Sequence, residues 1–132
     1  GLFSNSYEVA IVLQAMIQKG KYDNFKLFSQ DSFDQFNFCY FCDKENRSGV
    51  GFDKPQIEGR HGSTFGGVSP ESFGHYGYTG SMAWADPDKN IIFIFLSNRT
   101  YPTRENTLLQ TSNTRTRSQE IVYKSLIDYK WK

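Results

Sequence analysis

The sequence predicts an α/β (α+β) fold in which a mostly antiparallel sheet of about three or four strands is flanked by an N-terminal and a C-terminal helix. Three patterns lead to this prediction. Apolar residues recur with helical spacing near the N-terminus, two strand-like runs flank a turn between residues 73 and 97, and a second helical pattern follows near the C-terminus. The 132 residues are enough for one hydrophobic core, so we expect one domain or a piece of one.

The predicted N-terminal helix begins at Asn5, because an asparagine with Glu8 three residues later forms a capping box. Gly20 ends the helical pattern. The apolar side chains between these two points have a spacing that places them on one helical face: Val9, Val12, Leu13, Met16 and Ile17. We expect this helix to be a buried structural element without direct chemistry.

The segment after this helix is harder to interpret. Residues 21–32 are polar and are predicted to form a loop, with a short helix near residues 31–36. Phe36, Phe38 and Tyr40 then alternate with Asn and Cys, which predicts a half-buried strand.

The stretch from Phe73 to Ser81 is the centre of the predicted fold. Glycines stand at every third position, at Gly74, Gly77 and Gly80, in a run that otherwise has strand character. A glycine lets another backbone or a substrate approach closely, because no Cβ stands in the way. We therefore expect a strand edge that faces a ligand.

A hairpin is predicted directly after this stretch. Ser81–Ala85 and Ile91–Ser97 are strand-like, and the turn formers between them place the reversal at Pro87–Asn90. A polar connection with Pro102 follows, and the last amphipathic pattern predicts a helix from about Arg117 to Tyr129.

These elements divide the chain into three parts. The predicted parts are a helical part at residues 1–35, a sheet with the central strand and the hairpin at 36–100, and a connection with the C-terminal helix at 101–132.

Composition excludes several classes of function. The formal net charge is +1 with mixed signs, so we expect no nucleic-acid partner and no anionic membrane partner. No run reaches the roughly 18 apolar residues of a membrane span, and the N-terminus lacks a signal-peptide pattern. The compartment is unknown from the chain itself. Aromatic residues make up 17%, which indicates an aromatic core or an incomplete domain.

Two cysteines form a Cys-x-x-Cys motif at Cys39 and Cys42, and with His61 and His75 they could supply four zinc ligands. The spacings match no finger or ribbon pattern, and a strand would send the two thiols to opposite faces. We expect no metal and no other cofactor, and thiols that are free or incidentally paired.

Several runs of the sequence resemble one family. They are Gly1-Leu2-Phe3-Ser4, Gly49-Val50-Gly51-Phe52-Asp53, Ser69-Pro70-Glu71-Ser72-Phe73, Trp84-Ala85-Asp86-Pro87, Leu96-Ser97-Asn98-Arg99 and the C-terminal helix. Together they are similar to the C-terminal part of serine beta-lactamase-like hydrolases, in the branch with class C beta-lactamases, esterases and D-Ala-D-Ala peptidases. The resemblance implies that Gly49–Asp53 is a strand.

In that family a Lys-Thr-Gly strand, often His-Thr-Gly, faces the nucleophile, and His75-Tyr76-Gly77 is its counterpart here. The resemblance implies that His75 donates a hydrogen bond in the site and that the Tyr78 amide after Gly77 belongs to the oxyanion hole. A structural histidine bonded to a loop carbonyl is the alternative for His75. The residues implied in substrate binding are Tyr76, Thr79, Gly80 and Ser81.

The family nucleophile belongs to a Ser-x-x-Lys motif, and no serine of this chain has that motif. Tyr22-Asp23-Asn24 matches the Tyr-x-Asn pattern of the second motif, but it follows a helix that lies downstream of that motif in the family. The resemblance therefore implies that the upstream part of the same domain supplies the nucleophile and that this chain alone is inactive.

The resemblance implies a small ester, a beta-lactam or a peptidoglycan-type substrate, and a bacterial periplasmic or cell-surface location. The alternative is a non-catalytic module that binds cell-wall or glycan ligands in a larger protein, such as one fused to a glycoside hydrolase. The Phe-rich stretch from Phe25 to Phe41 could stack on sugars, although ordinary packing is the favoured explanation.

Overall fold

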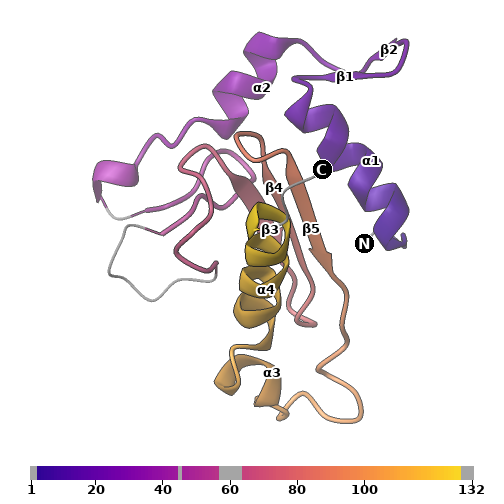
Figure 1. Cartoon of the computed structure of the whole chain (residues 1–132), viewed down its shortest axis with the longest axis vertical. Coiled ribbons are helices and arrows are strands. Elements are labelled where there is room, and N and C mark those ends of the chain that lie inside the picture. The colour runs from indigo at the N-terminus through magenta and orange to yellow at the C-terminus, as the bar shows by residue number, and fades with distance from the viewer. Residues whose placement is uncertain (1–2, 45, 57–63, 129–132) are drawn as a thin grey trace.

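A computed structural model describes residues 3–44, 46–56 and 64–128 of the chain. Helices and strands alternate along it, which confirms the mixed α/β class (Figure 1). The elements are α1 (Ser6–Ile17), β1 (Lys21–Tyr22), β2 (Phe25–Lys26), α2 (Gln30–Asn37), a short 3-10 helix (Cys42–Lys44), β3 (Phe73–Tyr76), β4 (Met82–Asp86), β5 (Ile91–Phe95), α3 (Leu108–Thr111) and α4 (Thr114–Asp128).

The α1 helix begins where the sequence predicts it. The Asn5 side chain accepts a hydrogen bond from the Glu8 amide at 3.0 Å, which satisfies one of the free amides of the first turn. Leu13 is buried, and Val9 and Met16 pack against the same cluster. The expected helical face is wrong at Val12, which is half exposed.

A small hairpin replaces the loop predicted between residues 21 and 32. β1 and β2 pair antiparallel with Tyr22 opposite Phe25, so Asp23 and Asn24 form a two-residue turn, and Asp23 adopts a positive φ of 51°. Aspartate tolerates this conformation because its short polar side chain can bond locally.

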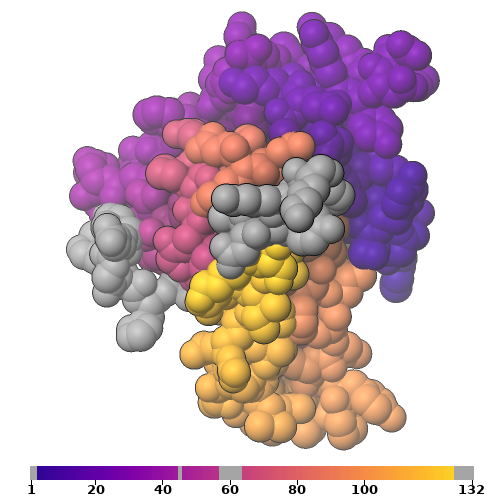
Figure 2. Space-filling model, viewed as in Figure 1, coloured from indigo at the N-terminus to yellow at the C-terminus, as the bar shows by residue number. Residues whose placement is uncertain are grey.

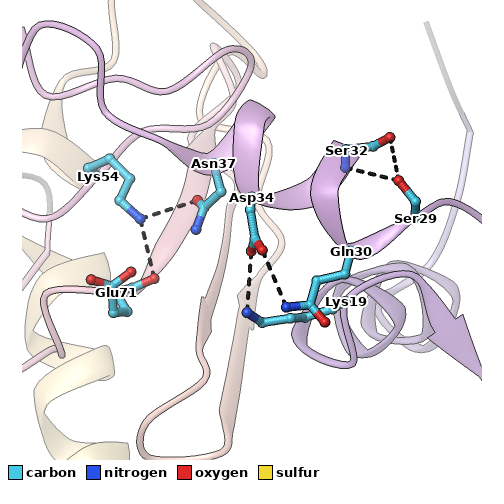
Figure 3. Close-up of polar contacts among 8 residues, drawn as sticks. All are labelled: Lys19, Ser29, Gln30, Ser32, Asp34, Asn37, Lys54 and Glu71. Atoms are coloured by element: carbon cyan, nitrogen blue, oxygen red, sulfur yellow. Dashed lines mark hydrogen bonds and ion pairs between the residues drawn. The ribbon is translucent and has the colours of Figure 1, made fainter.

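The short helix predicted near residues 31–36 is confirmed as α2. Ser29 caps it by accepting from the Ser32 amide at 3.0 Å, and the helix is tied to the end of α1 by Lys19 and Asp34, whose charged groups lie 3.3 Å apart (Figure 3). The helix buries Phe33 against the sheet.

The half-buried strand predicted at residues 36–40 is wrong. α2 continues to Asn37, and Phe36, Phe38 and Tyr40 are exposed, so their alternation reflects no buried face. The prediction that Cys39 and Cys42 point to opposite faces depended on this strand and is also wrong. Their sulfur atoms form a disulfide across a sequence separation of 3 residues.

The predicted hairpin is confirmed by β4 and β5. These strands and β3 form an antiparallel sheet in the order β3-β4-β5, with His75 opposite Ala83 and Ala83 opposite Ile94. The reversal between β4 and β5 contains Asn90, which adopts a positive φ of 53°, as the predicted turn requires. The central run predicted as strand from Phe73 to Ser81 stays extended only as far as Tyr76.

The Gly49–Asp53 strand that the resemblance implies is reduced to isolated bridges. Asp53 exchanges two backbone hydrogen bonds with Gly74, at 2.7 and 3.1 Å, and it also pairs with Ser48. This segment therefore covers only the first half of the outer edge of β3.

Each face of the sheet has its own helix. α1 packs on the face with Phe73, Ala85 and the half-buried Ile92 and Ile94. The other face carries a second cluster of Met82, Trp84 and Phe93. α4 crosses in front of this second face (Figure 1), and the space-filling view shows α4 and the neighbouring α3 filling the lower part of the molecule (Figure 2).

The C-terminal helix begins earlier than the sequence predicts, at Thr114 instead of Arg117, and α3 precedes it in the connection that was expected to be irregular. α4 is fixed to the sheet by Tyr123, whose hydroxyl donates to the Asp86 carboxylate at 3.2 Å. Burial and the Asp86 charge raise the pKa of the Tyr123 hydroxyl well above its usual value.

Candidate active-site strand and turn

The candidate site lies on β3, which is an edge strand of the β3-β4-β5 sheet. Gly74 is required where β3 crosses Trp84, because a Cβ at Gly74 would come within 2.3 Å of the indole ring and of the Ala83 carbonyl oxygen. The close approach keeps β3 against β4. Asp53 pairs with Gly74 on the outer edge of β3, so the edge from His75 onward lies past this bridge.

His75 is exposed at this edge. Its Nδ1 lies 2.9 Å from the carbonyl oxygen of Tyr76. A carbonyl oxygen only accepts, so we assign the ring hydrogen to Nδ1. In the neutral imidazole Nε2 then carries the lone pair and accepts hydrogen bonds, whereas in the imidazolium it donates them.

The chain reverses in a β-turn at residues 77–80. The Gly80 amide donates to the Gly77 carbonyl at 2.9 Å, and the Gly77 amide donates to the Ser81 carbonyl at 2.8 Å. Gly80 has a positive φ of 95°, and a Cβ there would come within 2.2 Å of the Leu109 side chain. Both backbone conformation and space therefore require glycine at this position.

The Tyr78 amide has no hydrogen-bond acceptor among the described residues. Its side chain is exposed, and the Arg99 guanidinium lies over the ring at 4.8 Å from the centroid. A backbone N–H without an acceptor, three residues after an exposed histidine, can stabilise an oxyanion or bind a carbonyl oxygen.

Thr79 and Ser81 are tied to the irregular segment that follows β5. The Thr79 carbonyl accepts from the Arg99 amide at 2.8 Å and from the Ser97 hydroxyl at 3.2 Å. Ser81 bonds Ser97 twice at 3.2 Å, once as donor and once as acceptor. These polar groups hold the turn in place and are already occupied by protein partners.

The structure thus brings the predicted residues from His75 to Ser81 together in one strand and turn. Tyr22-Asp23-Asn24 lies apart from them, in the β1–β2 hairpin. His61 lies outside the described residues.

Arg99 and Arg115 contact the turn, although the sequence analysis did not place either of them at the site. Arg115 donates to the Gly80 carbonyl at 3.3 Å and lies 5.3 Å from the centroid of the Tyr76 ring. Arg99 lies four residues after Phe95, the last residue of β5, and this closeness in sequence is a signal that could have indicated a link to the hairpin.

Lys54 is a further residue that the sequence did not single out. Its ammonium is buried beside the start of β3 and donates to Asn37 Oδ1 at 3.2 Å and to the Glu71 carbonyl at 3.3 Å (Figure 3). Burial lowers the pKa of this ammonium, with a smaller opposing effect from Glu71. Lys54 joins α2 to the loop that enters β3.

The described residues contain no cluster of three or more metal-ligating side chains, and the disulfide occupies both cysteine sulfurs. No helix in the described ranges combines the length and hydropathy of a membrane span.

Comparison with known proteins identifies the family to which the chain belongs. A family model described as Beta-lactamase matches residues 31–114, which is more than half of the chain. The chain therefore belongs to the beta-lactamase family of serine hydrolases, which also includes penicillin-binding-protein-like enzymes. The matched region includes α2 except its first residue, the whole β3-β4-β5 sheet and α3.

Relatives in three Salmonella strains carry the name "Putative D-alanyl-D-alanine carboxypeptidase". Those of Salmonella enteritidis, Salmonella agona and Salmonella gallinarum are each 32% identical over 102 residues, which cover 75% of this chain and 22% of the relative. The chain thus spans about a fifth of the length of the curated relatives that it matches. No solved structure matches the chain.

Proposed function

We propose that this chain supplies the third-motif strand and part of the oxyanion hole of a serine hydrolase that acts through an acyl-enzyme. His75, Gly77 and Tyr78 are the catalytic residues of this proposal. The nucleophilic serine and its lysine come from a part of the domain outside the 132 residues, because no Ser-x-x-Lys motif occurs within them.

Two observations together carry the proposal. The Tyr78 amide has no acceptor among the described residues, and His75 is exposed at the edge of the sheet. In acyl transfer the carbonyl oxygen of the substrate becomes an oxyanion. A backbone N–H aimed at that oxygen stabilises the transition state by about 2.7 to 4 kcal/mol. Gly77 keeps the approach to this amide open because it has no side chain.

His75 acts through Nε2, since Nδ1 is bonded to the Tyr76 carbonyl. The neutral ring accepts a hydrogen bond from the hydroxyl or water that assists the serine, and the charged ring donates to a substrate carboxylate or carbonyl. The structural alternative for His75 shares the same Nδ1 contact, so only a kinetic test separates the two roles.

Two features support a partner segment from the same domain. The outer edge of β5 pairs with no strand among the described residues. Beside α2 lies an open apolar hollow of about 340 Å³, whose lining includes Met16, Phe28, Phe33, Phe36, Val50 and Phe52. Surfaces of this kind normally meet further chain.

The substrate class that we propose is a small ester, a beta-lactam or a peptidoglycan-type peptide. The name of the Salmonella relatives supports the peptidoglycan-type substrate, since a D-alanyl-D-alanine peptide is a peptidoglycan component. We propose a bacterial periplasmic or cell-surface location on the same grounds. Tyr76, Thr79, Gly80 and Ser81 would shape the substrate groove around the turn.

The test uses the natural-length protein that carries residues 1–132 and measures acylation by an ester and by a beta-lactam. His75→Ala should lower the acylation efficiency by about 10- to 1,000-fold, the range for one oriented donor or acid-base contact. His75→Lys should recover part of it. Lys26→Ala, which alters an exposed side chain of the β1–β2 hairpin, is the matched control. Loss of folding by His75→Ala, with full activity in the folded fraction, would identify a structural histidine.

A second candidate function is non-catalytic binding of glycans. It is favoured by the exposed aromatic rings of Phe38, Tyr40 and Phe41, which flank the Cys39–Cys42 disulfide. Aromatic rings bind sugars by stacking, and Phe38 and Tyr40 pack edge to face at 4.9 Å. Binding of peptidoglycan fragments without any acylation would favour this candidate.

A further inference from the structure

In the turn at residues 77–80, each of the four successive carbonyl oxygens accepts a hydrogen bond. The Gly77 oxygen accepts from the Gly80 amide at 2.9 Å, and the Tyr78 oxygen accepts from Arg99 Nε at 2.9 Å. The Thr79 oxygen accepts from the Arg99 amide at 2.8 Å, and the Gly80 oxygen accepts from Arg115 at 3.3 Å. Because each peptide unit is planar, fixing its oxygen also fixes the direction of its N–H.

Arg99 supplies two of these four contacts, one from its side chain and one from its backbone. Its guanidinium also lies 4.8 Å from the centroid of the Tyr78 ring, so it holds the Tyr78 residue at both the carbonyl and the side chain. The same group donates to the carbonyl oxygens of Arg104 and Asn106 at 3.2 and 3.3 Å. Arg99 therefore joins the turn to the connection after β5.

We infer that Arg99 is a positioning residue that orients the Tyr78 amide for the oxyanion, an inference that rests on the proposed function. The contacts of Arg99 to the turn are to the Tyr78 carbonyl and ring and to the Thr79 carbonyl, and not to the Tyr78 N–H itself. Arg99 acts by restricting the peptide units on the C-terminal side of Tyr78, through the Tyr78 and Thr79 carbonyls. The Thr79 carbonyl shares its peptide unit with the Gly80 N–H, and that N–H bonds the Gly77 oxygen, which shares its peptide unit with the Tyr78 N–H. The guanidinium suits this role because its rigid planar fork can reach several oxygens at once, whereas a lysine ammonium is a single flexible point charge.

Two readouts on the natural-length protein test this inference. The first is amide hydrogen exchange at Gly80, whose N–H closes the turn, with the β4–β5 amides as internal reference. The second is the acylation rate constant, measured separately from the substrate dissociation constant. The variants are Arg99→Ala, Arg99→Lys and the matched control Arg104→Ala, since the Arg104 side chain is exposed and its ion pair within the described part of the chain is with the exposed Glu105, at 3.6 Å.

Arg99→Ala should speed exchange at Gly80 at least about tenfold and leave the β4–β5 amides unchanged. It should lower the acylation rate constant by about 10- to 100-fold with little change in substrate binding, because a donor displaced by about 1 Å loses much of its effect. Arg99→Lys should recover only a small part of both losses. Arg104→Ala should match the wild type.

The inference is overturned if Arg99→Ala leaves Gly80 exchange unchanged, if it loosens the β4–β5 amides as much as the turn, or if Arg99→Lys is fully active. A wild type that shows no acylation would reject the proposed function alone. The exchange measurements would then still decide whether Arg99 orders the turn.

Discussion

The two faces of the β3-β5 sheet are held by different chemistry. The face under α1 is closed by apolar contacts, with Phe73 packed edge to face against Phe33 and Phe52 at 5.3 and 5.2 Å. The face under α4 also has an apolar cluster, but it adds a buried polar group, since Asp86 accepts from the amides of Ser69 and Lys89 at 2.9 and 3.2 Å as well as from Tyr123. Apolar packing stabilises the fold without requiring a particular orientation of the groups in contact. The hydrogen bonds to Asp86 are directional, so they fix the positions of the groups that donate them.

This difference matters for the site because β3, like β4 and β5, contributes side chains to both faces. Phe73 points to the α1 face, and the loop that leads into β3 is held on the α4 side through Ser69. We expect changes on the α1 face to alter stability at all pH values, and changes on the α4 face to alter pH dependence as well.

The largest effect is expected from Phe73→Ala. This substitution removes a fully buried ring and leaves a cavity between α2 and the sheet, so it should lower the free energy of unfolding by about 3 to 5 kcal/mol. Chemical denaturation measures the change. A loss below about 1 kcal/mol would mean that Phe73 is not the centre of this face.

Asp86→Asn should have the next largest effect. The asparagine side chain has the shape of the carboxylate, but its NH₂ group would face one of the groups that now donate a hydrogen bond to Asp86. We therefore expect the free energy of unfolding to fall by about 2 to 3 kcal/mol. The matched control is Asp88→Asn in the exposed part of the same turn, which should change stability little. Equal effects of the two substitutions would show that the buried contacts do not matter.

Tyr123→Phe should cost about 1 kcal/mol at neutral pH, the usual value of one hydrogen bond. Its clearer signature is in alkali. The folded pKa of Tyr123 is raised above the unfolded value of 10.0, so above about pH 10 the unfolded chain loses a proton that the folded chain keeps. The wild type should therefore lose stability as the pH rises past 10, by up to about 1.4 kcal/mol per pH unit.

Unfolding measured from pH 8 to 11.5 with wild type and Tyr123→Phe separates this contribution, since the variant should lack it. Lys54 contributes with the opposite sign, because its folded pKa is lowered and stability rises as the pH approaches 10.5. Identical pH profiles for wild type and variant would contradict the assignment to Tyr123.

Lys19→Ala gives the smallest expected effect. Lys19 and Asp34 form an exposed ion pair with half of each side chain accessible, so its loss should cost less than about 0.5 kcal/mol and should fade at high salt. A cost above 1 kcal/mol would mean that the contact between α1 and α2 depends on this pair.

The spacing of apolar residues and the turn-forming residues predicted the helices and strands that bury one side against the rest of the protein. The Asn5 cap, the β4–β5 hairpin and the C-terminal helix follow from such patterns. The stretch from Phe36 to Tyr40 failed because its aromatic side chains are exposed, so their alternation carries no information about burial.

The candidate site was predictable only in part. His75 and Tyr78 follow from the third-motif resemblance and lie on one strand and turn. Arg99 was not predictable as a partner of Tyr78, because the two residues are 21 positions apart and the contact is to a backbone oxygen, which no side-chain pattern records. The same holds for Lys54, whose partners Asn37 and Glu71 are each 17 positions away.

The measurement that tests the central claim most directly is mass spectrometry of the natural-length protein after incubation with a beta-lactam and with an activated ester. The account predicts one covalent adduct per molecule, on a serine outside residues 1–132, which forms more slowly in His75→Ala. An adduct on a serine within residues 1–132, or no adduct with either reagent, would contradict the claim that this strand and turn complete a serine hydrolase site.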